Sequence, residues 1–262
     1  MDATQDFIID CRKEGVLVKD ATYTTRLIKG GGLLPQMRTL VRLWHEDTDA
    51  SAVIAYVEQH GLLGRVSHRR IKDVVRRVFI PRYVEGNPPQ AWRFLQAFED
   101  NAAPVSVVRP LYYFYAARAE MVMGDFVRLA LYERYISGLA TVRVEDALHF
   151  ITEAESEGRI TEPWSESVRL RVARHLLAAL RDFGILEGRA HKRIAAPYLS
   201  VLSFAHMAFL LTQERRGAAV FDHPDWRLFL LRPATVEHLF VEADRHGPQL
   251  YRDQGLATLP PV

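Results

Sequence analysis

The sequence predicts an all-α protein of two helical lobes, with helix-turn-helix and winged-helix-like elements and at most a small β-hairpin. Apolar residues recur at helical spacing along most of the 262 residues. Asp, Ser, Gly and Pro residues stand where these helices would begin and end. The composition, 48% hydrophobic and 25% charged, is that of a folded globular protein. These three observations exclude extensive disorder and leave only short segments for strands.

The first predicted lobe spans residues 24–86 and follows an N-terminal arm of residues 1–23. Gly30, Gly31 and Gly32 predict a loop, and apolar spacing predicts a helix over 33–44. Asp49 is a suitable N-cap for a helix to about His60. Ser67 then caps a basic helix that we expect to end before Pro81. The run Glu-Gly-Asn-Pro-Pro at 85–89 is the predicted boundary.

The second predicted lobe spans residues 87–262. It begins with apolar helices rich in Tyr and Phe, a set at helical spacing that is typical of a core. A winged-helix-like segment of about residues 144–196 follows, with helices over 144–156 and 165–183 and a hairpin over 185–195. Helices near 198–214 and 234–245 precede a short C-terminal tail.

The chain is expected to be cytoplasmic and not to enter a membrane. The N-terminus lacks a basic region before an apolar run. The most apolar stretch, 104–123, is interrupted by Arg109, Arg118 and Glu120, so it predicts a buried helix. The single cysteine, Cys11, cannot form an internal disulfide, which suits a reducing compartment.

Positive charge is concentrated on the helix predicted after Ser67. Residues 65–82 hold seven basic side chains and one acidic, a net charge of +6, whereas the whole chain carries +2. On a helical wheel, Ile71, Val78 and Phe79 share one arc with neighbouring apolar residues, and the cations lie opposite. The basic residues that we expect to contact a polyanion are Arg65, Arg69, Arg70, Lys72, Arg76, Arg77 and Arg82.

A second basic segment covers the helix over 165–183 and the hairpin after it. Residues 165–193 hold seven basic and three acidic side chains, a net charge of +4. His175 lies on the same polar face of this helix. The basic residues predicted to form the second contact surface are Arg171, Arg174, Arg181, Arg189, Lys192 and Arg193.

Segregation of charge is the observation that favours nucleic acid. The two segments carry +10 together, so the rest of the chain carries about −8. A solvated helix face usually mixes signs, because opposite charges one turn apart stabilise it. The order of helix, Gly-containing turn and basic helix over 49–80 also suits a helix-turn-helix. Phosphate contacts would dominate, because neither basic helix carries Asn or Gln to contact adenine.

Other functions stay open at this point. A basic helical face does not by itself distinguish DNA from RNA, and it could equally contact acidic surfaces of partner proteins. Whether the two basic segments share one face of the molecule does not follow from the sequence. The sequence carries no nucleophile elbow, phosphate-binding loop, dinucleotide-binding loop or zinc-protease motif. We therefore expect no catalysis, no metal and no cofactor.

Spaced residues along the chain carry a family resemblance. They include Thr-Arg-Leu-Ile-Lys-Gly at 25–30, Trp44, the basic helix closing at Arg82, Gly-Asp-Phe at 124–126, Trp-Ser at 164–165 with Ser-Val-Arg at 167–169, Leu-Arg-Asp-Phe-Gly-Ile-Leu at 180–186, Pro197, Trp226 and Leu-Phe at 228–229. Over roughly residues 24–257 the sequence resembles the BrxA family of BREX bacteriophage-exclusion systems. The resemblance implies a helical protein with winged-helix character that binds double-stranded DNA and acts with other proteins of a defence system.

Overall fold

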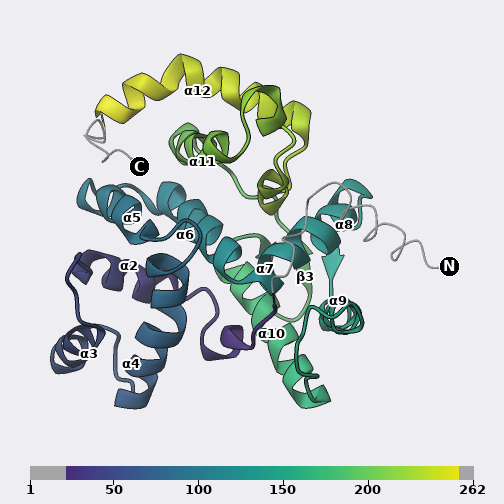
Figure 1. Cartoon of the computed structure of the whole chain (residues 1–262). Coiled ribbons are helices and arrows are strands. Elements are labelled where there is room, and N and C mark those ends of the chain that lie inside the picture. The colour runs from purple at the N-terminus through teal and green to yellow at the C-terminus, as the bar shows by residue number, and fades with distance from the viewer. Residues whose placement is uncertain (1–21, 254–262) are drawn as a thin grey trace.

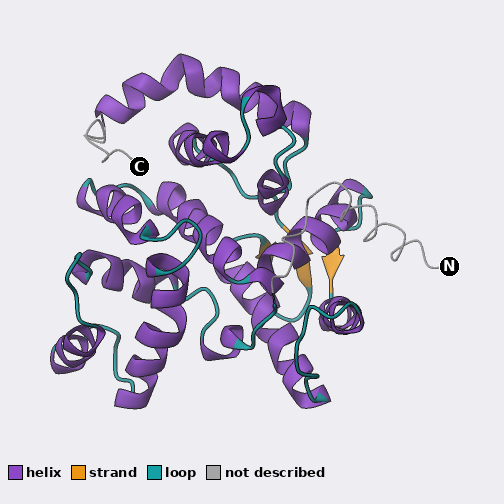
Figure 2. Cartoon of the chain, viewed as in Figure 1, coloured by secondary structure: helices purple, strands orange, loops and turns teal. Residues whose placement is uncertain are grey.

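The computed structural model describes residues 22–253, and helices dominate it (Figure 2). The predicted all-α class is confirmed. Cys11 and the end of the predicted C-terminal tail, residues 259–262, lie outside the described residues. Tyr23 was assigned to the N-terminal arm, but it is buried, and its backbone N–H donates to the Arg159 carbonyl at 2.8 Å. The folded part of the chain therefore includes this residue.

The first predicted helices form where expected. Asp49 accepts a hydrogen bond from the Ala52 N–H at 3.1 Å, and Ser67 accepts one from the Arg70 N–H at 3.3 Å, so both predicted N-caps are confirmed. The elements of this region are η1 (Arg26–Lys29), α2 (Leu34–Leu43), α3 (Ala50–Gln59), α4 (His68–Val74) and η2 (Val75–Val84).

The basic helix does not end before Pro81, as the sequence predicted, but continues through it to Val84. From Val75 onward the turns are π-helical, so each bond reaches five residues back, as from the Glu85 N–H to the Ile80 carbonyl at 2.9 Å. A proline disrupts an α-helix by clashing with the carbonyl four residues before it. The wider π turn relieves this conflict and lets α4 and η2 run as one helix.

The centre of the molecule is a set of buried aromatic helices. They are α5 (Ala91–Asp100), α6 (Val105–Ala119), α7 (Met121–Asp125), η3 (Phe126–Leu131) and α8 (Tyr132–Ile136). Tyr112, Tyr113, Phe114 and Tyr115 of α6 are fully buried, so the predicted aromatic core is confirmed. The buried apolar side chains form one continuous cluster. The division of the chain near residue 87 stays a prediction.

The predicted hairpin forms and gains a third strand. The elements are β1 (Thr141–Val142), α9 (Val144–Ser156), α10 (Glu166–Asp182), β2 (Leu186–Glu187) and β3 (Lys192–Ile194). The sheet is antiparallel in the order β1-β3-β2, with Val142 opposite Lys192 and Leu186 opposite Ile194. The sequence did not predict β1, because two residues are too few to show an alternating pattern.

The C-terminal helices cover the upper side of the molecule in Figure 1. They are α11 (Val201–Glu214), η4 (Gly217–Val220), η5 (Pro224–Phe229) and α12 (Pro233–Asp253), and α12 crosses α11. Within the described residues, every helix is too short or too polar to cross a bilayer.

Buried ion pairs connect these C-terminal helices to the centre. Arg128 donates to Asp225 at 2.6 and 2.8 Å and to Asp125 at 3.1 Å. Arg118 lies 3.0 Å from the second Asp225 oxygen and also pairs with Glu214. Each of these arginines bridges two carboxylates from different elements, so the network joins α6, η3, α11 and η5.

Candidate nucleic-acid interface

Helix α4 and its continuation η2 turn one apolar side inward and one cationic side outward. Ile71, Val74, Val75, Val78 and Phe79 are buried, as the helical wheel predicted. The exposed cations of this segment are Arg65, Arg69, Lys72, Arg76 and Arg77, and Arg70 is half-buried. The cationic face predicted from the sequence is therefore present on the surface.

The cations of α4 and η2 form two stripes. Arg69 and Arg76 lie seven residues apart on one stripe, and Arg76 donates to the Ser51 hydroxyl of α3 at 2.8 Å. Arg70 and Arg77 lie on the other stripe with Asp73, which pairs with Arg77 at 3.4 Å and with Lys29 at 3.1 Å. The single acid of the helix is thus already occupied by two cations.

Arg82 does not belong to this surface, contrary to the prediction. Its side chain is fully buried, and it pairs with Glu120 at 3.2 Å. Its other nitrogens donate to the carbonyls of Gly31 at 2.7 Å and Gly30 at 3.0 Å. A guanidinium with these partners is not available to a phosphate, so its role is to hold the loop after η1 against η2.

The short helix η1 lies between the two basic helices. It packs against η2 on one side and α10 on the other, and in Figure 1 it stands between α4 and α10, which both reach the lower edge. Arg70 donates to the Lys29 carbonyl from the α4 side. On the α10 side, a Cβ at Gly32 would lie only 2.6 Å from the Asp182 Cβ, so glycine permits this close approach.

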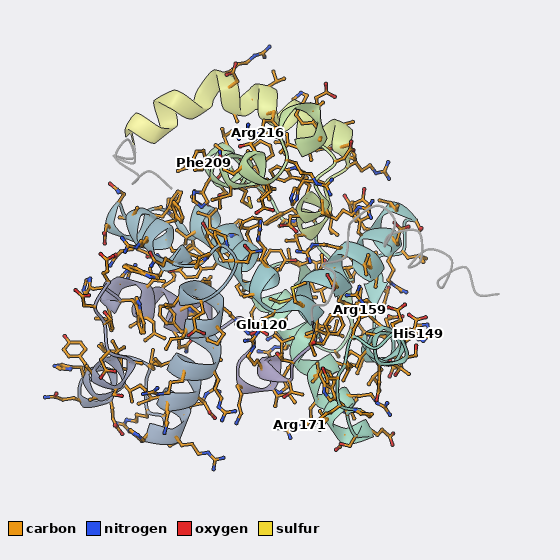
Figure 3. All side chains as sticks on the ribbon, in the orientation of Figure 1. Glu120, His149, Arg159, Arg171, Phe209 and Arg216 are labelled. Atoms are coloured by element: carbon orange, nitrogen blue, oxygen red, sulfur yellow. The ribbon has the colours of Figure 1, made fainter. Side chains whose placement is uncertain are left out.

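Helix α10 presents a second row of cations. Arg171, Arg174 and Arg181 are exposed, while Val172, Leu176 and Leu180 are buried. Arg171 and Arg174 make no hydrogen bond or ion pair with any described residue, whereas Arg181 donates to Asp182 at 3.0 Å. Figure 3 shows Arg171 near the lower end of this helix. The N-terminal half of α10 thus carries the freer cations.

The two basic segments meet at His175. This histidine of α10 is half-buried, and its pKa is lowered by burial and then by the charges of Arg171 and Arg70. Charges act on a ring in this way only when they are near it. Arg70 of α4 also donates to the Lys29 carbonyl of η1, and η1 packs against α10, so the two basic segments adjoin on either side of η1.

The hairpin cations lie at the other end of α10. Arg189 and Arg193 are exposed, and half-buried Lys192 donates to the Arg189 carbonyl at 3.0 Å. The ten-residue step from Arg171 to Arg181 alone spans about 15 Å at 1.5 Å per residue. The candidate interface is therefore elongated, with the Arg70–His175–Arg171 junction at one end and the hairpin at the other.

Sequence reasoning placed His175 beside the cations without assigning it to the site, and it overlooked η1. Arg26 of η1 pairs with Glu120 at 3.5 Å and donates to the Ala119 carbonyl at 3.1 Å, so it supports η1 from behind. Lys29 reaches α4 through Asp73. Two basic residues three positions apart before a glycine triplet were visible in the sequence, but their neighbours in space were not.

Comparison with known families agrees with the resemblance carried by the spaced residues. Residues 21–209 match BrxA, and this stretch contains η1, both basic helices and the three-stranded sheet. A comparison with curated proteins finds no match. Since the matched stretch is well over half of the chain, the chain belongs to the BrxA family and is a component of a BREX phage-defence system.

Proposed function

We propose that the chain is a non-catalytic double-stranded DNA-binding component of its defence system, which contacts mainly phosphates and has weak sequence specificity. The observation that supports this most is the packing of η1 between the two basic helices, which brings Arg70 and Arg171, 101 residues apart in sequence, to the same side chain, His175. Bringing like charges together is unfavourable for the free protein, and a bound polyanion reverses that cost.

The order of elements around α10 supports the same proposal. Helix α8, strand β1, helices α9 and α10 and the hairpin β2–β3 follow one another as in a winged helix, with β3 between β1 and β2. In that arrangement α10 takes the place of the recognition helix and residues 188–191 form the wing. Its exposed side chains include Arg171, Arg174 and Arg181 and no Asn or Gln, which favours phosphate contacts over base contacts.

The test is a titration of a labelled random-sequence duplex of about 30 base pairs, followed by fluorescence anisotropy from about 50 to about 200 mM salt. We expect the logarithm of the binding constant to fall steeply and linearly with the logarithm of salt concentration, by about 0.9 per phosphate contacted. No binding at the lowest salt would contradict the proposal and favour a protein-binding scaffold. Equal competition by duplex RNA would favour an RNA-binding protein instead.

Duplex affinity should depend on pH through His175. Burial, then Arg171 and Arg70, lower the pKa of His175 below its ordinary 6.5, so the ring is neutral in the free protein at neutral pH. A phosphate beside these arginines favours the protonated ring, so binding takes up a proton. Affinity should rise severalfold as the pH falls from about 7 to about 5.5.

The comparison uses two single variants at constant ionic strength. His175→Gln should flatten the rise in affinity at low pH, whereas His238→Gln, at an exposed histidine of α12, should retain it. An unchanged rise in the His175 variant would show that another group takes up the proton.

A further inference from the structure

The hairpin that joins β2 to β3 ends in a four-residue tip with one free cation. The tip is Gly-Arg-Ala-His at 188–191, and all four residues are exposed. The Arg189 carbonyl accepts a hydrogen bond from Lys192, but the Arg189 side chain makes no hydrogen bond or ion pair with any described residue. Gly188 and Ala190 on either side are small, so no bulky side chain flanks the guanidinium of Arg189.

The backbone of the tip is held in one shape. Gly188 has a φ of +86°, and a Cβ there would overlap the His191 carbonyl, so the turn requires glycine. The Lys192 Nζ donates to the Arg189 carbonyl at 3.0 Å and closes the tip from β3. Strand β3 is itself paired on both sides, with β1 and β2. Binding therefore has to order the Arg189 side chain but not the loop that carries it.

The charge of Arg189 is not cancelled within the hairpin. Residues 185–195 hold three basic side chains and one acidic, a net charge of +2. The acid, Glu187, lies opposite Arg193 in the antiparallel register, where opposite charges on facing strands attract one another. Arg189 is thus the uncompensated cation of the tip, with Lys192 and Arg193 beside it on β3.

The hairpin stands at one end of α10, away from the freer cations of that helix. Strand β2 contacts α10 and begins four residues after the helix ends, and in Figure 1 the sheet lies level with the upper end of α10. Arg171, near the lower end, is about 15 Å along the helix from Arg181. A major groove and the next minor groove are separated by half a helical turn, roughly 17 Å. The hairpin is therefore about one groove away from Arg171.

The two grooves of B-DNA admit different parts of a protein. A minor groove of about 6 Å excludes a helix of about 10–12 Å but admits a single side chain from a narrow turn. A·T-rich minor grooves are narrow and have an enhanced negative potential that attracts Arg. G·C pairs add a guanine amino group to the floor of this groove. A guanidinium is also more weakly hydrated than an ammonium, so it leaves water more readily.

We propose that Arg189 enters the minor groove next to the major groove that α10 contacts, and that it gives the protein a preference for A·T-rich duplexes. Lys192 and Arg193 lie at the rim of the groove and contact its phosphates. The preference is for base composition rather than for one sequence, because A·T and T·A pairs look alike from the minor groove. The inference rests on the proposed DNA binding and names the class of duplex that binds best.

The test compares three labelled duplexes of about 30 base pairs by anisotropy at constant salt. One is A·T-rich, one is G·C-rich, and the third is the G·C-rich duplex with inosine in place of every guanine. Inosine lacks the amino group in the minor groove but keeps the major-groove acceptors of guanine. The A·T-rich and inosine duplexes should bind alike and about fivefold more tightly than the G·C-rich one, the lower end of what one base contact contributes.

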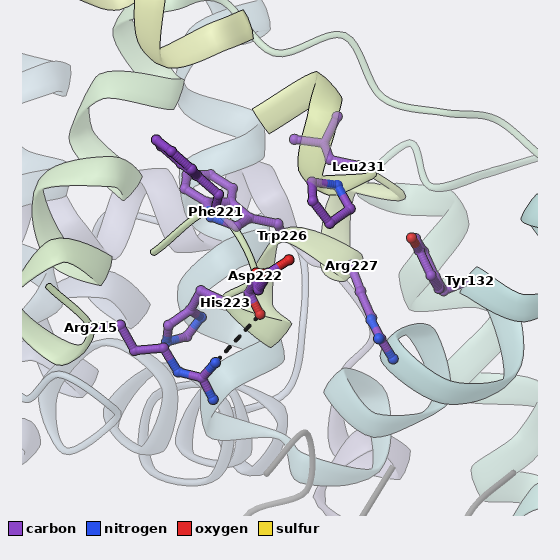
Figure 4. Close-up of a pocket in the computed structure, with 9 residues that line it drawn as sticks. Tyr132, Arg215, Phe221, Asp222, His223, Trp226, Arg227 and Leu231 are labelled. Atoms are coloured by element: carbon purple, nitrogen blue, oxygen red, sulfur yellow. Dashed lines mark hydrogen bonds between the residues drawn. The ribbon is translucent and has the colours of Figure 1, made fainter. Parts of the chain in front are cut away.

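Three variants locate the source of the preference. Arg189→Gln should abolish it, whereas Arg174→Gln should weaken all three duplexes equally, because a phosphate contact does not depend on the base. Arg215→Gln removes the same charge from the cavity of Figure 4, whose lining includes no residue of the candidate interface, and should change no duplex.

The results that would overturn the inference are distinct from those that would overturn DNA binding. If the wild-type protein binds all three duplexes equally, or binds the inosine duplex like the G·C-rich one, Arg189 does not act in the minor groove. The same conclusion follows if Arg189→Gln retains the preference or weakens all three duplexes equally. If no duplex binds at all, the proposed function itself is wrong.

Discussion

Replacing Arg171 and Arg174 of α10 by Gln should weaken duplex binding on the order of 50-fold at 0.1 M salt. Both side chains are exposed and unpaired with any described residue, so each is free to contact a phosphate. At that salt, a slope of about 0.9 per contact corresponds to roughly eightfold in affinity for each one lost. The salt slope should become shallower by about 1.8 units.

The same change at Arg69 of α4 and Arg77 of η2 tests whether one duplex touches both basic helices. Because the two basic helices adjoin on either side of η1, we expect their separate losses to add, on the order of 10³-fold in the combined variant. Affinity is followed by anisotropy, with Arg216 and Arg245 changed to Gln as a control of equal charge. If the combined variant binds no less tightly than the double variant with the larger loss, only one of the two helices contacts the duplex.

Asp225→Asn should lower the free energy of unfolding by about 3–5 kcal/mol, the usual effect of breaking a buried ion pair. The change leaves Arg118 and Arg128 without a carboxylate that both contact within 3.0 Å. Burial by itself would raise the pKa of Asp225, but Arg128 and Arg118 outweigh it and hold the pKa below its ordinary 3.8. Its stabilising effect is therefore complete at neutral pH and is lost as the pH falls through that lower pKa.

Urea denaturation at neutral pH measures this effect. Asp222→Asn is the matched control, because it makes the same chemical change three residues away at an exposed carboxylate. That control should change stability by less than about 0.5 kcal/mol. A similar small effect at Asp225 would mean that the arginines find other partners without it.

Local patterns were sufficient for most of the fold. The caps at Asp49 and Ser67 and the apolar arc from Ile71 to Phe79 depend on neighbours within one or two turns, and each was predicted. Strand β1 was missed because its pairing partner, β3, lies some 50 residues later. A two-residue strand owes its existence to that partner and leaves no periodicity in the sequence.

Arg82 shows how charge alone misleads. Arg82 follows Val78 by four residues and Phe79 by three, so a helix that continues past Pro81 places all three side chains on the same buried arc. The helical wheel would therefore have predicted that the Arg82 side chain points into the core. Its partners, Glu120 and the carbonyls of Gly30 and Gly31, are distant in sequence. The junction of Arg70 with Arg171 was unpredictable for the same reason, because it depends on how η1 packs between two helices.

The position of η1 also determines when the basic surface can form during synthesis. Tyr23, just before η1, contacts Asp125 and Arg159, and Gly32, just after it, contacts Asp182. Asp125, Arg159 and Asp182 are each synthesised at least 100 residues after the residue that they contact, Tyr23 or Gly32. The nascent chain can therefore complete helix α4 early, but the surface that joins α4 to α10 assembles only once residue 182 has emerged. Its two cationic halves stay apart while the rest of the chain is being made.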